Sequence, residues 1–350
     1  MGAGEMIGRE LLSGPRGRRA CLSLLASADP RLWSLARRAE AGSANPDFIV
    51  ELADALTAPE LLHYARGASE SSLMAALTVS VDAARYWQQP DETDLLLDDP
   101  RIRTALIPAA DAIASSSEAA WWSTPLEREK QRYVQWMDET PLEPPALVGA
   151  VANLARWRVG ARADESRSLE RPRKLTANSS GEWWSAPVRV PLPTTTRARS
   201  TIGAVKLALA EDGFGWEHAR VWPLLPSSDC QVFEVTGPDA WAELVGRYPM
   251  DVSLSRRHDW WRATGHEGTW LIPDWAGVAS DFDAVHLTVF GYLGTAGRAL
   301  PVRDSHTVLA GWSPDETYWL ADVLTQGGAP EDWCRDQRTS RPWTVCLGGD

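Results

Sequence analysis

The residues that decide the fold run from position 161 to position 190 and read ARADESRSLE RPRKLTANSS GEWWSAPVRV. Residues 161–181 are rich in Arg, Ser, Glu and Asn and nearly free of large apolar side chains. Such a segment buries too little apolar surface to hold a core, so we predict a linker there. From Glu182 onward, short extended runs replace the helical spacing that precedes them. The sequence therefore predicts a helical domain over residues 1–160, a linker over 161–181 and a mixed α+β domain over 182–350.

The part before this stretch has apolar residues at helical spacing. The spacing predicts helices over residues 31–40, 47–56, 59–66, 73–87 and 99–115. Thr124-Pro125-Leu126-Glu127 matches a capping box with Pro at the first helical position. We therefore expect a further helix after Thr124, burying Leu126, Tyr133, Trp136 and Met137. Pro144 and Pro145 predict one more helix, which continues through Trp157.

The part after the stretch is typical of strands mixed with short helices. Extended runs predict strands over residues 183–190, 220–225, 231–235, 269–272, 284–290 and 307–312. Caps followed by Pro predict helices over residues 240–248 and 274–280, and Ser313-Pro314-Asp315-Glu316 predicts another over 315–324. The run from Thr194 to Arg197 is interpreted as a solvated turn. The fold class is therefore α+β, with a helical N-terminal domain and a Trp-rich mixed α/β-sheet C-terminal domain.

Composition limits the classes of function. The formal net charge is −12 over 350 residues, which makes nucleic acid an unlikely partner because phosphate neutralisation needs clustered Lys and Arg. Only three lysines accompany 32 arginines, and Ile is also scarce, a bias that indicates a GC-rich bacterial genome. Four scattered cysteines and no secretory leader favour reduced thiols in the cytoplasm. No apolar run approaches the roughly 20 residues that span a bilayer, so we expect no membrane association.

His286 is the first candidate for chemistry. In a strand over 284–290, His286 and Thr288 would project from the same face, with Asp281 and Asp283 just before them. An imidazole beside carboxylates is a plausible acid–base group, and Asp283 or Asp274 would orient it or share its proton. The alternative is a buried structural His whose ring is bonded to a carbonyl or to Asp283.

The run from Arg256 to Arg262 is the second candidate. Arg256 and Arg257 could neutralise an anionic group, and Trp260, Trp261 or Trp275 could supply a flat wall. The alternative is an Arg–Trp stack that only holds a loop in place. His258, Asp259, His266 and Glu267 match no established zinc spacing, so no metal site is predicted.

Two functions from different classes remain open. The first is a cytosolic bacterial enzyme that uses these residues for group transfer on a nucleotide-like or aromatic anionic small molecule. Its cofactor stays unknown, because the familiar phosphate-loop, dinucleotide and hydrolase motifs are missing from the sequence. The second is a non-catalytic module that binds a protein partner through Trp and Arg side chains. The enzyme should show His, Asp and Arg around one concave pocket, whereas the module should show Trp residues on an exposed patch.

Overall fold

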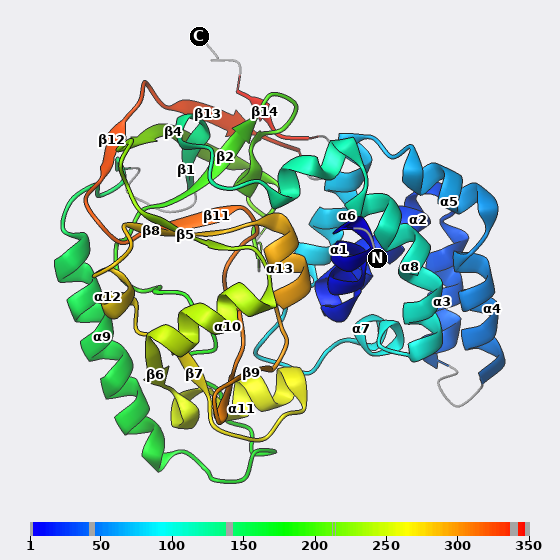
Figure 1. Ribbon diagram of the computed structural model, residues 1–350, viewed down its shortest axis with the longest axis horizontal. Coiled ribbons are helices and arrows are strands. Elements are labelled where there is room, and N and C mark those ends of the chain that lie inside the picture. Colours follow the sequence, from blue (N-terminus) through cyan, green and yellow to red (C-terminus); the bar gives the residue numbers. More distant parts are fainter. Residues whose placement is uncertain are drawn as a thin grey trace.

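The computed structural model describes residues 3–41, 46–137, 143–211, 213, 215–336 and 342–346. Helices gather at one side of the molecule and a mixed sheet at the other, with α13 (Val289–Thr295) between them (Figure 1). The α+β class is therefore confirmed. Within the described residues, no helix combines the length and the apolar character needed to cross a membrane.

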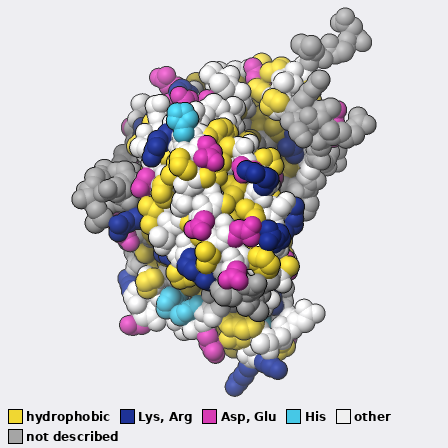
Figure 2. All heavy atoms as spheres, turned by 90° about the vertical axis from the view of Figure 1, so that its right-hand side faces the viewer, with side chains coloured by type: hydrophobic (Ala, Val, Ile, Leu, Met, Phe, Trp, Pro, Cys, Tyr) yellow, Lys and Arg dark blue, Asp and Glu magenta, His cyan; other side chains and the backbone are white. Residues whose placement is uncertain are grey.

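The N-terminal helices pack around α2 (Pro15–Ala28), which is buried from Arg16 to Ala26. Its neighbours are α1 (Ala3–Ser13), α3 (Arg31–Ala41), α5 (Pro59–Arg66), α6 (Glu70–Asp82), α7 (Glu92–Leu97) and α8 (Pro100–Ala114), and α4 (Pro46–Leu56) packs on α3 and α8. Most predicted helices of this part are confirmed, because their apolar stripes face one shared core. The helix predicted over 73–87 ends early, at Asp82. On the face formed by this helical side, acidic and basic side chains are interspersed (Figure 2).

The main sheet of the described residues has the strand order β14-β13-β4-β1-β2-β11-β8-β5. Only β5 and β8 pair in parallel, and the other neighbours are antiparallel. The bounds along this path are β14 (Thr344–Val345), β13 (Glu331–Cys334), β4 (His218–Pro226), β1 (Gln131–Trp136), β2 (Thr194–Arg199), β11 (Glu316–Trp319), β8 (Ala284–Leu287) and β5 (Val232–Val235). Off this path, β12 (Leu324–Gln326) pairs with β4, and β3 (Gly203–Ala204) pairs with β2.

Short helices and two small hairpins complete the C-terminal part. The helices are α10 (Pro238–Arg247), α11 (Ser253–Thr264) and α12 (Trp275–Val278). One hairpin pairs β6 (Pro249–Asp251) with β7 (Leu271–Pro273), and the other pairs β9 (Leu300–Val302) with β10 (Ser305–Thr307). The predicted helices near 240–248 and 274–280 and the strands near 220–225 and 231–235 are confirmed.

Two predicted helices are wrong, and both were predicted from capping boxes. The segment after Thr124 forms one short 3-10 turn and β1, and the segment after Ser313 forms β11 and β12. In the first box both capping side chains, Thr124 and Glu127, accept hydrogen bonds from the Arg197 guanidinium. In the second box Asp315 accepts from the same guanidinium, and Glu316 pairs with Lys206. Tertiary contacts therefore override the local signal.

Three strand predictions and one turn prediction also need correction. Residues 183–190 form no strand, and residues 194–197, interpreted as a turn, belong to the buried strand β2. The run predicted over 284–290 ends at Leu287, because Thr288 caps α13 by accepting a hydrogen bond from Gly291 N at 3.0 Å. Of the run predicted over 307–312, only Thr307 lies in a strand.

The predicted linker is partly helical. Helix α9 (Ala150–Arg167) begins after the position expected from Pro144 and Pro145, and it extends into residues 161–167. It then packs along α11 and α12 of the C-terminal part. Residues 171–193 contain no regular element and lead into β2. The largest core cluster joins side chains from both sides of this segment, from Leu11 to Leu320.

Candidate functional site

One hollow with both aromatic and charged side chains on its walls lies beside β2 and β11. It has a volume of about 480 Å³, which is in the range of small-molecule sites. Four indoles line it, from Trp136, Trp183, Trp184 and Trp216, and we call it the Trp pocket. Trp136 and Trp216 stack face to face, with ring centroids 4.4 Å apart and planes 3° apart.

The loop that carries Trp183 and Trp184 is held by residues the sequence had marked for ligand binding. Trp260 Nε1 donates to the carbonyl of Trp183 at 2.7 Å, and Arg256 donates to the carbonyl of Trp184 at 3.3 Å. Trp275 Nε1 donates to the next carbonyl, that of Ser185, at 2.9 Å. Three consecutive carbonyls are thus fixed by buried side chains, which act as positioning residues for the wall of the Trp pocket.

The backbone around Trp184 is tightly constrained. Gly311 has φ +71°, and a Cβ there would lie 2.6 Å from Trp184 Cβ, so only glycine fits without strain. On the outer side, the exposed guanidinium of Arg189 lies 4.8 Å from the Trp184 ring centroid and pairs with Glu182 at 3.3 Å. Arg189 itself has φ +68°, an uncommon conformation for a residue with a side chain.

Charged groups converge on the same pocket from β2, β11 and the segment between β3 and β4. Lys206 forms an ion pair with Glu316, and its Nζ lies 3.3 Å from Thr194 Oγ1. Glu211 lies on the other wall, where its Oε2 accepts a hydrogen bond from Trp312 N at 3.1 Å. Burial raises the pKa of Glu211 to about 7, against weaker effects of Tyr292 and backbone donors. This carboxyl can therefore hold or release a proton near neutral pH.

A buried polar chain continues from Glu211 toward the helical side. Burial and the charge of Glu211 raise the pKa values of both Tyr86 and Tyr292 well above the ordinary value, so both phenols stay protonated. Arg16 lies beyond them, where it donates to the carbonyl of Ser80 at 2.7 Å and pairs with buried Asp94. The Glu211 carboxyl is thus held by the surrounding structure.

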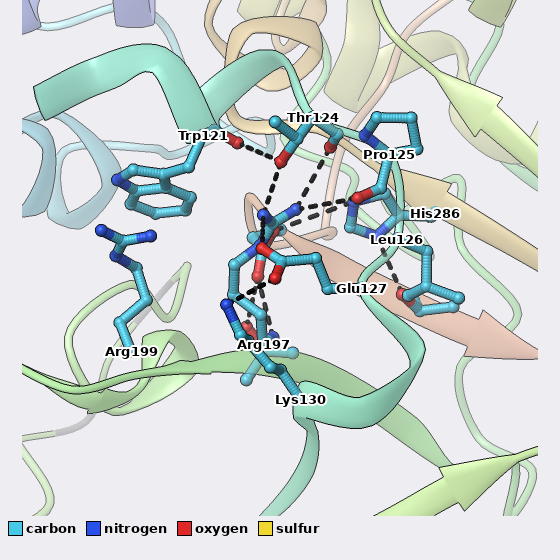
Figure 3. Close-up of polar contacts among 12 residues, drawn as sticks. Trp121, Thr124, Pro125, Leu126, Glu127, Lys130, Arg197, Arg199 and His286 are labelled. Atoms are coloured by element: carbon cyan, nitrogen blue, oxygen red, sulfur yellow. Dashed lines mark hydrogen bonds and ion pairs between the residues drawn. The ribbon is translucent and has the colours of Figure 1, made fainter. Parts of the chain in front are cut away.

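The opposite face of the sheet carries a second polar cluster, centred on Arg197 (Figure 3). Arg197 Nε donates to Asp315 Oδ1 at 2.6 Å, and Nη1 donates to Thr124 Oγ1 at 2.6 Å and to Glu127 Oε1 at 2.7 Å. Nη2 donates to the carbonyls of Thr124 and Pro125 at 3.2 and 3.4 Å. These contacts use the whole donor set of a guanidinium, so Arg197 ties the 124–127 segment to the sheet and has no donor left for a ligand.

A row of polar side chains crosses four strands on this face. The register places Thr317 of β11 opposite both Thr195 of β2 and His286 of β8, and it places His286 opposite Glu234 of β5. Opposed residues project to the same face, so the four side chains are neighbours. Thr195 and Thr317 are fully buried, whereas Glu234 reaches the solvent edge.

His286 lies in this row, where its side chain is 1% exposed. Its Nδ1 is 2.9 Å from Thr317 Oγ1, while its Nε2 is 3.8 Å from Asp315 Oδ1 and 4.0 Å from Glu234 Oε2. Burial, assisted by the charge of Arg197, lowers the pKa of His286 to about 3, so the imidazole is neutral at neutral pH. Burial raises the pKa of Glu234 to about 7. The carboxylates nearest to His286 are therefore those of Asp315 and Glu234.

The two carboxylates predicted beside His286 have other partners. Asp283 Oδ2 accepts a hydrogen bond from Gln231 N at 2.7 Å at the start of β5. Asp274 precedes α12 and accepts from Arg158 Nε of α9 at 2.7 Å. The structure therefore does not bring Asp283 or Asp274 together with the His286 ring.

The remaining predicted residues are also spread over several places. Arg257 donates to the carbonyl of Arg171 at 2.7 Å, Trp261 is half-buried on α11, and Thr288 caps α13. The sequence interpretation missed Glu211, Lys206 and Glu316, which meet at the Trp pocket from segments far apart in the chain. Among the described residues there is no group of three or more His, Cys, Asp or Glu placed to hold a metal ion.

No family model, curated protein or solved structure matches this chain. The case for a function therefore rests on the chemistry of the Trp pocket.

Proposed function

We propose that the chain is a cytosolic bacterial enzyme that transfers a group on a flat, nucleotide-like or aromatic anionic small molecule bound in the Trp pocket. One observation carries this proposal. Stacked indoles and a buried carboxyl with a pKa of about 7 line the same hollow of about 480 Å³. Pockets that combine apolar walls with a few convergent polar groups and a perturbed pKa are the usual form of an active site.

Each wall of the pocket has a role in this proposal. The indoles of Trp183, Trp184 and Trp216 line the pocket at different tilts, and a flat ring would stack on one of them, an interaction worth about 1–3 kcal/mol. Lys206 and Arg189 are the cations that line the pocket, and an anionic group on the ligand would compete there with their present partners, Glu316 and Glu182. Arg256 and Arg257, given this role from the sequence, are already bonded to the protein itself.

Glu211 is the proposed acid–base residue. Because its pKa is about 7, both protonation states are populated at neutral pH, and the carboxyl can give a proton to a leaving group or take one from an attacking group. His286 lies on the opposite face of the sheet, buried and neutral, and has no part in this proposal.

The alternative of a non-catalytic binding module requires Trp side chains on an open patch. All 19 tryptophans belong to the described part of the chain, and none is among its exposed large hydrophobic side chains. Seven of them are fully buried: Trp122, Trp241, Trp260, Trp270, Trp275, Trp312 and Trp319. The exposed apolar residues are scattered Val and Leu, which favours the pocket over the patch.

The test is ligand binding followed by turnover. Thermal unfolding would be measured against a panel of nucleotides, dinucleotides and aromatic carboxylates. A ligand present at 100 times its dissociation constant stabilises by about 2.7 kcal/mol. We expect one class to stabilise the wild type, to lose this effect in Trp216→Leu and to keep it in Trp33→Phe, the control on distant α3.

Glu211→Gln then separates binding from chemistry. We expect this variant to keep the ligand-induced stabilisation and to lose conversion of the ligand, followed by mass spectrometry. Stabilisation that persists in Trp216→Leu would place the ligand outside the Trp pocket. Conversion that persists in Glu211→Gln would remove Glu211 from the mechanism.

A further inference from the structure

The last two strands of the sheet bring two thiols together. Strand β14 pairs antiparallel with β13, with Cys334 opposite Thr344. Cys346 lies two residues beyond Thr344 and therefore on the same face as Cys334. Its own N–H donates to the carbonyl of Asp332 at 2.8 Å, so the pairing continues to Cys346. Cys334 and Cys346 are therefore diagonal neighbours on one face of the β13–β14 pair.

These thiols differ from the other two in the chain. Cys21 is 0% exposed and Cys230 is 4% exposed, both inside core clusters. Cys334 and Cys346 are only partly buried, so a small oxidant in solution can reach them. A pair of adjacent, accessible thiols is the arrangement from which a reversible disulfide forms.

We propose that Cys334 and Cys346 form a redox-active pair that closes to a disulfide and fixes β14 on β13. The oxidant is a low-molecular-weight disulfide. The Cys334 sulfur, as thiolate, attacks one sulfur of the oxidant, forms a mixed disulfide and releases one small thiolate. The Cys346 thiol then gives its proton to solvent, its sulfur attacks the Cys334 sulfur, and the second small thiolate leaves. Two cysteine thiols are oxidised and one small disulfide is reduced to two thiols.

The order of these steps follows from the environment of Cys346. Partial burial, followed by the hydrogen bond and charge of Cys334 and the charge of Asp332, raises the pKa of Cys346 to about 12. A thiol that stays protonated is a poor first nucleophile, so the first attack belongs to Cys334. Cys346 is the resolving thiol, which acts once the mixed disulfide has formed.

The pair is connected to the Trp pocket. Arg335, next to Cys334, donates through its backbone N to Glu217 O at 2.9 Å and through Nε to Trp216 O at 2.8 Å. Its guanidinium lies 5.0 Å from the Trp343 ring centroid, and Trp343 lies 5.8 Å from Trp136, the stacking partner of Trp216. A disulfide would therefore restrain the strands that support one wall of the pocket. This consequence for ligand affinity rests on the proposed function, whereas disulfide formation does not.

The test uses the full native chain, first reduced with a phosphine and then exposed to oxidised glutathione as the small disulfide. Intact mass, peptide mapping and alkylation of the remaining thiols report the products. We expect the wild type to lose about 2 Da, the mass of two hydrogens, and to give one cross-linked peptide pair joining Cys334 to Cys346. Cys21 and Cys230 should stay reduced and react with the alkylating agent only after unfolding.

Two single variants provide the control. Cys346→Ser lacks the resolving thiol, so we expect it to stop at a mixed disulfide on Cys334. Cys334→Ser should be modified more slowly than Cys346→Ser, because the partial burial of Cys346 persists in that variant. Mixed disulfides on both cysteines of the wild type, cross-links only between chains, or no reaction at either residue would each overturn the proposal. All of these readouts are independent of any ligand, so their failure is distinct from failure of the proposed function.

Discussion

Arg197 and Asp315 face each other inside the sheet, with Arg197 Nε 2.6 Å from Asp315 Oδ1 and both side chains only 1% exposed. Asp315 also accepts hydrogen bonds from Arg197 N at 2.9 Å and Thr196 Oγ1 at 3.1 Å. It does so from a left-handed conformation with φ +58°, which Asp tolerates better than most residues. The pair joins β2 and the start of β11 to the 124–127 segment, which Arg197 also binds.

Replacing Arg197 by Met should destabilise the protein strongly. The change leaves Asp315 buried without its cation, a situation that typically costs about 3–5 kcal/mol. The measurement is urea unfolding followed by Trp fluorescence. Arg220→Met is the matched control, because Arg220 pairs with Asp332 through two hydrogen bonds at a partly exposed site and should cost about 0–1 kcal/mol. Equal losses of unfolding free energy for the two variants would contradict the conclusion that Arg197 holds the 124–127 segment to the sheet.

Glu234 and His286 should have opposite effects on stability as the pH changes. The pKa of Glu234 rises from 4.5 to about 7 on folding, so the folded state holds the extra proton and Glu234 reduces stability as the pH rises through this window. The pKa of His286 falls from 6.5 to about 3, so the unfolded state holds the extra proton and His286 reduces stability as the pH falls below 6.5. Between about pH 4.5 and 6.5 the two effects partly cancel.

Glu234→Gln should therefore gain stability relative to wild type as the pH rises from 5 to 8, by at most about 1.4 kcal/mol per pH unit. His286→Gln should gain stability relative to wild type as the pH falls from 6.5 to 4. Urea unfolding at several pH values measures both differences. Glu129→Gln is the control, because Glu129 is exposed. Stability differences that do not change with pH would mean that folding does not shift the pKa values of Glu234 and His286.

Replacing either of two glycines by Ala should change the free energy of unfolding, in opposite directions. Gly311→Ala places a Cβ 2.6 Å from Trp184 Cβ at φ +71°, so we expect a loss of about 1–3 kcal/mol. Gly160 lies on the exposed side of α9 with no atom within 4 Å of a new Cβ, so Gly160→Ala should stabilise by about 0.5–1 kcal/mol. Thermal unfolding compares the two. A Gly311→Ala variant as stable as wild type would mean that Trp184 is free to move and that the pocket wall is not constrained there.

The two capping boxes are the places where prediction from the sequence failed. Thr124-Pro125-Leu126-Glu127 and Ser313-Pro314-Asp315-Glu316 carry the same local signal, and neither begins an α-helix. In the second, Glu316 Oε2 still accepts a hydrogen bond from Ser313 N at 3.2 Å, as in a capping box, although a strand follows. The local signal describes which side chains can cap a helix, whereas their partners here include Arg197 and Lys206, which are distant in sequence.

The sequence by itself determined the α+β class, most N-terminal helices and the strands near 220–225 and 231–235, because apolar periodicity depends only on neighbours along the chain. It also singled out Arg256, Trp260 and Trp275. Only the tertiary structure decided that these three hold the carbonyls of Trp183, Trp184 and Ser185, and that Glu211 and Lys206 meet the indoles of the same loop. The partner of a polar side chain depends on which distant segments pack together, and periodicity carries no information about that pairing.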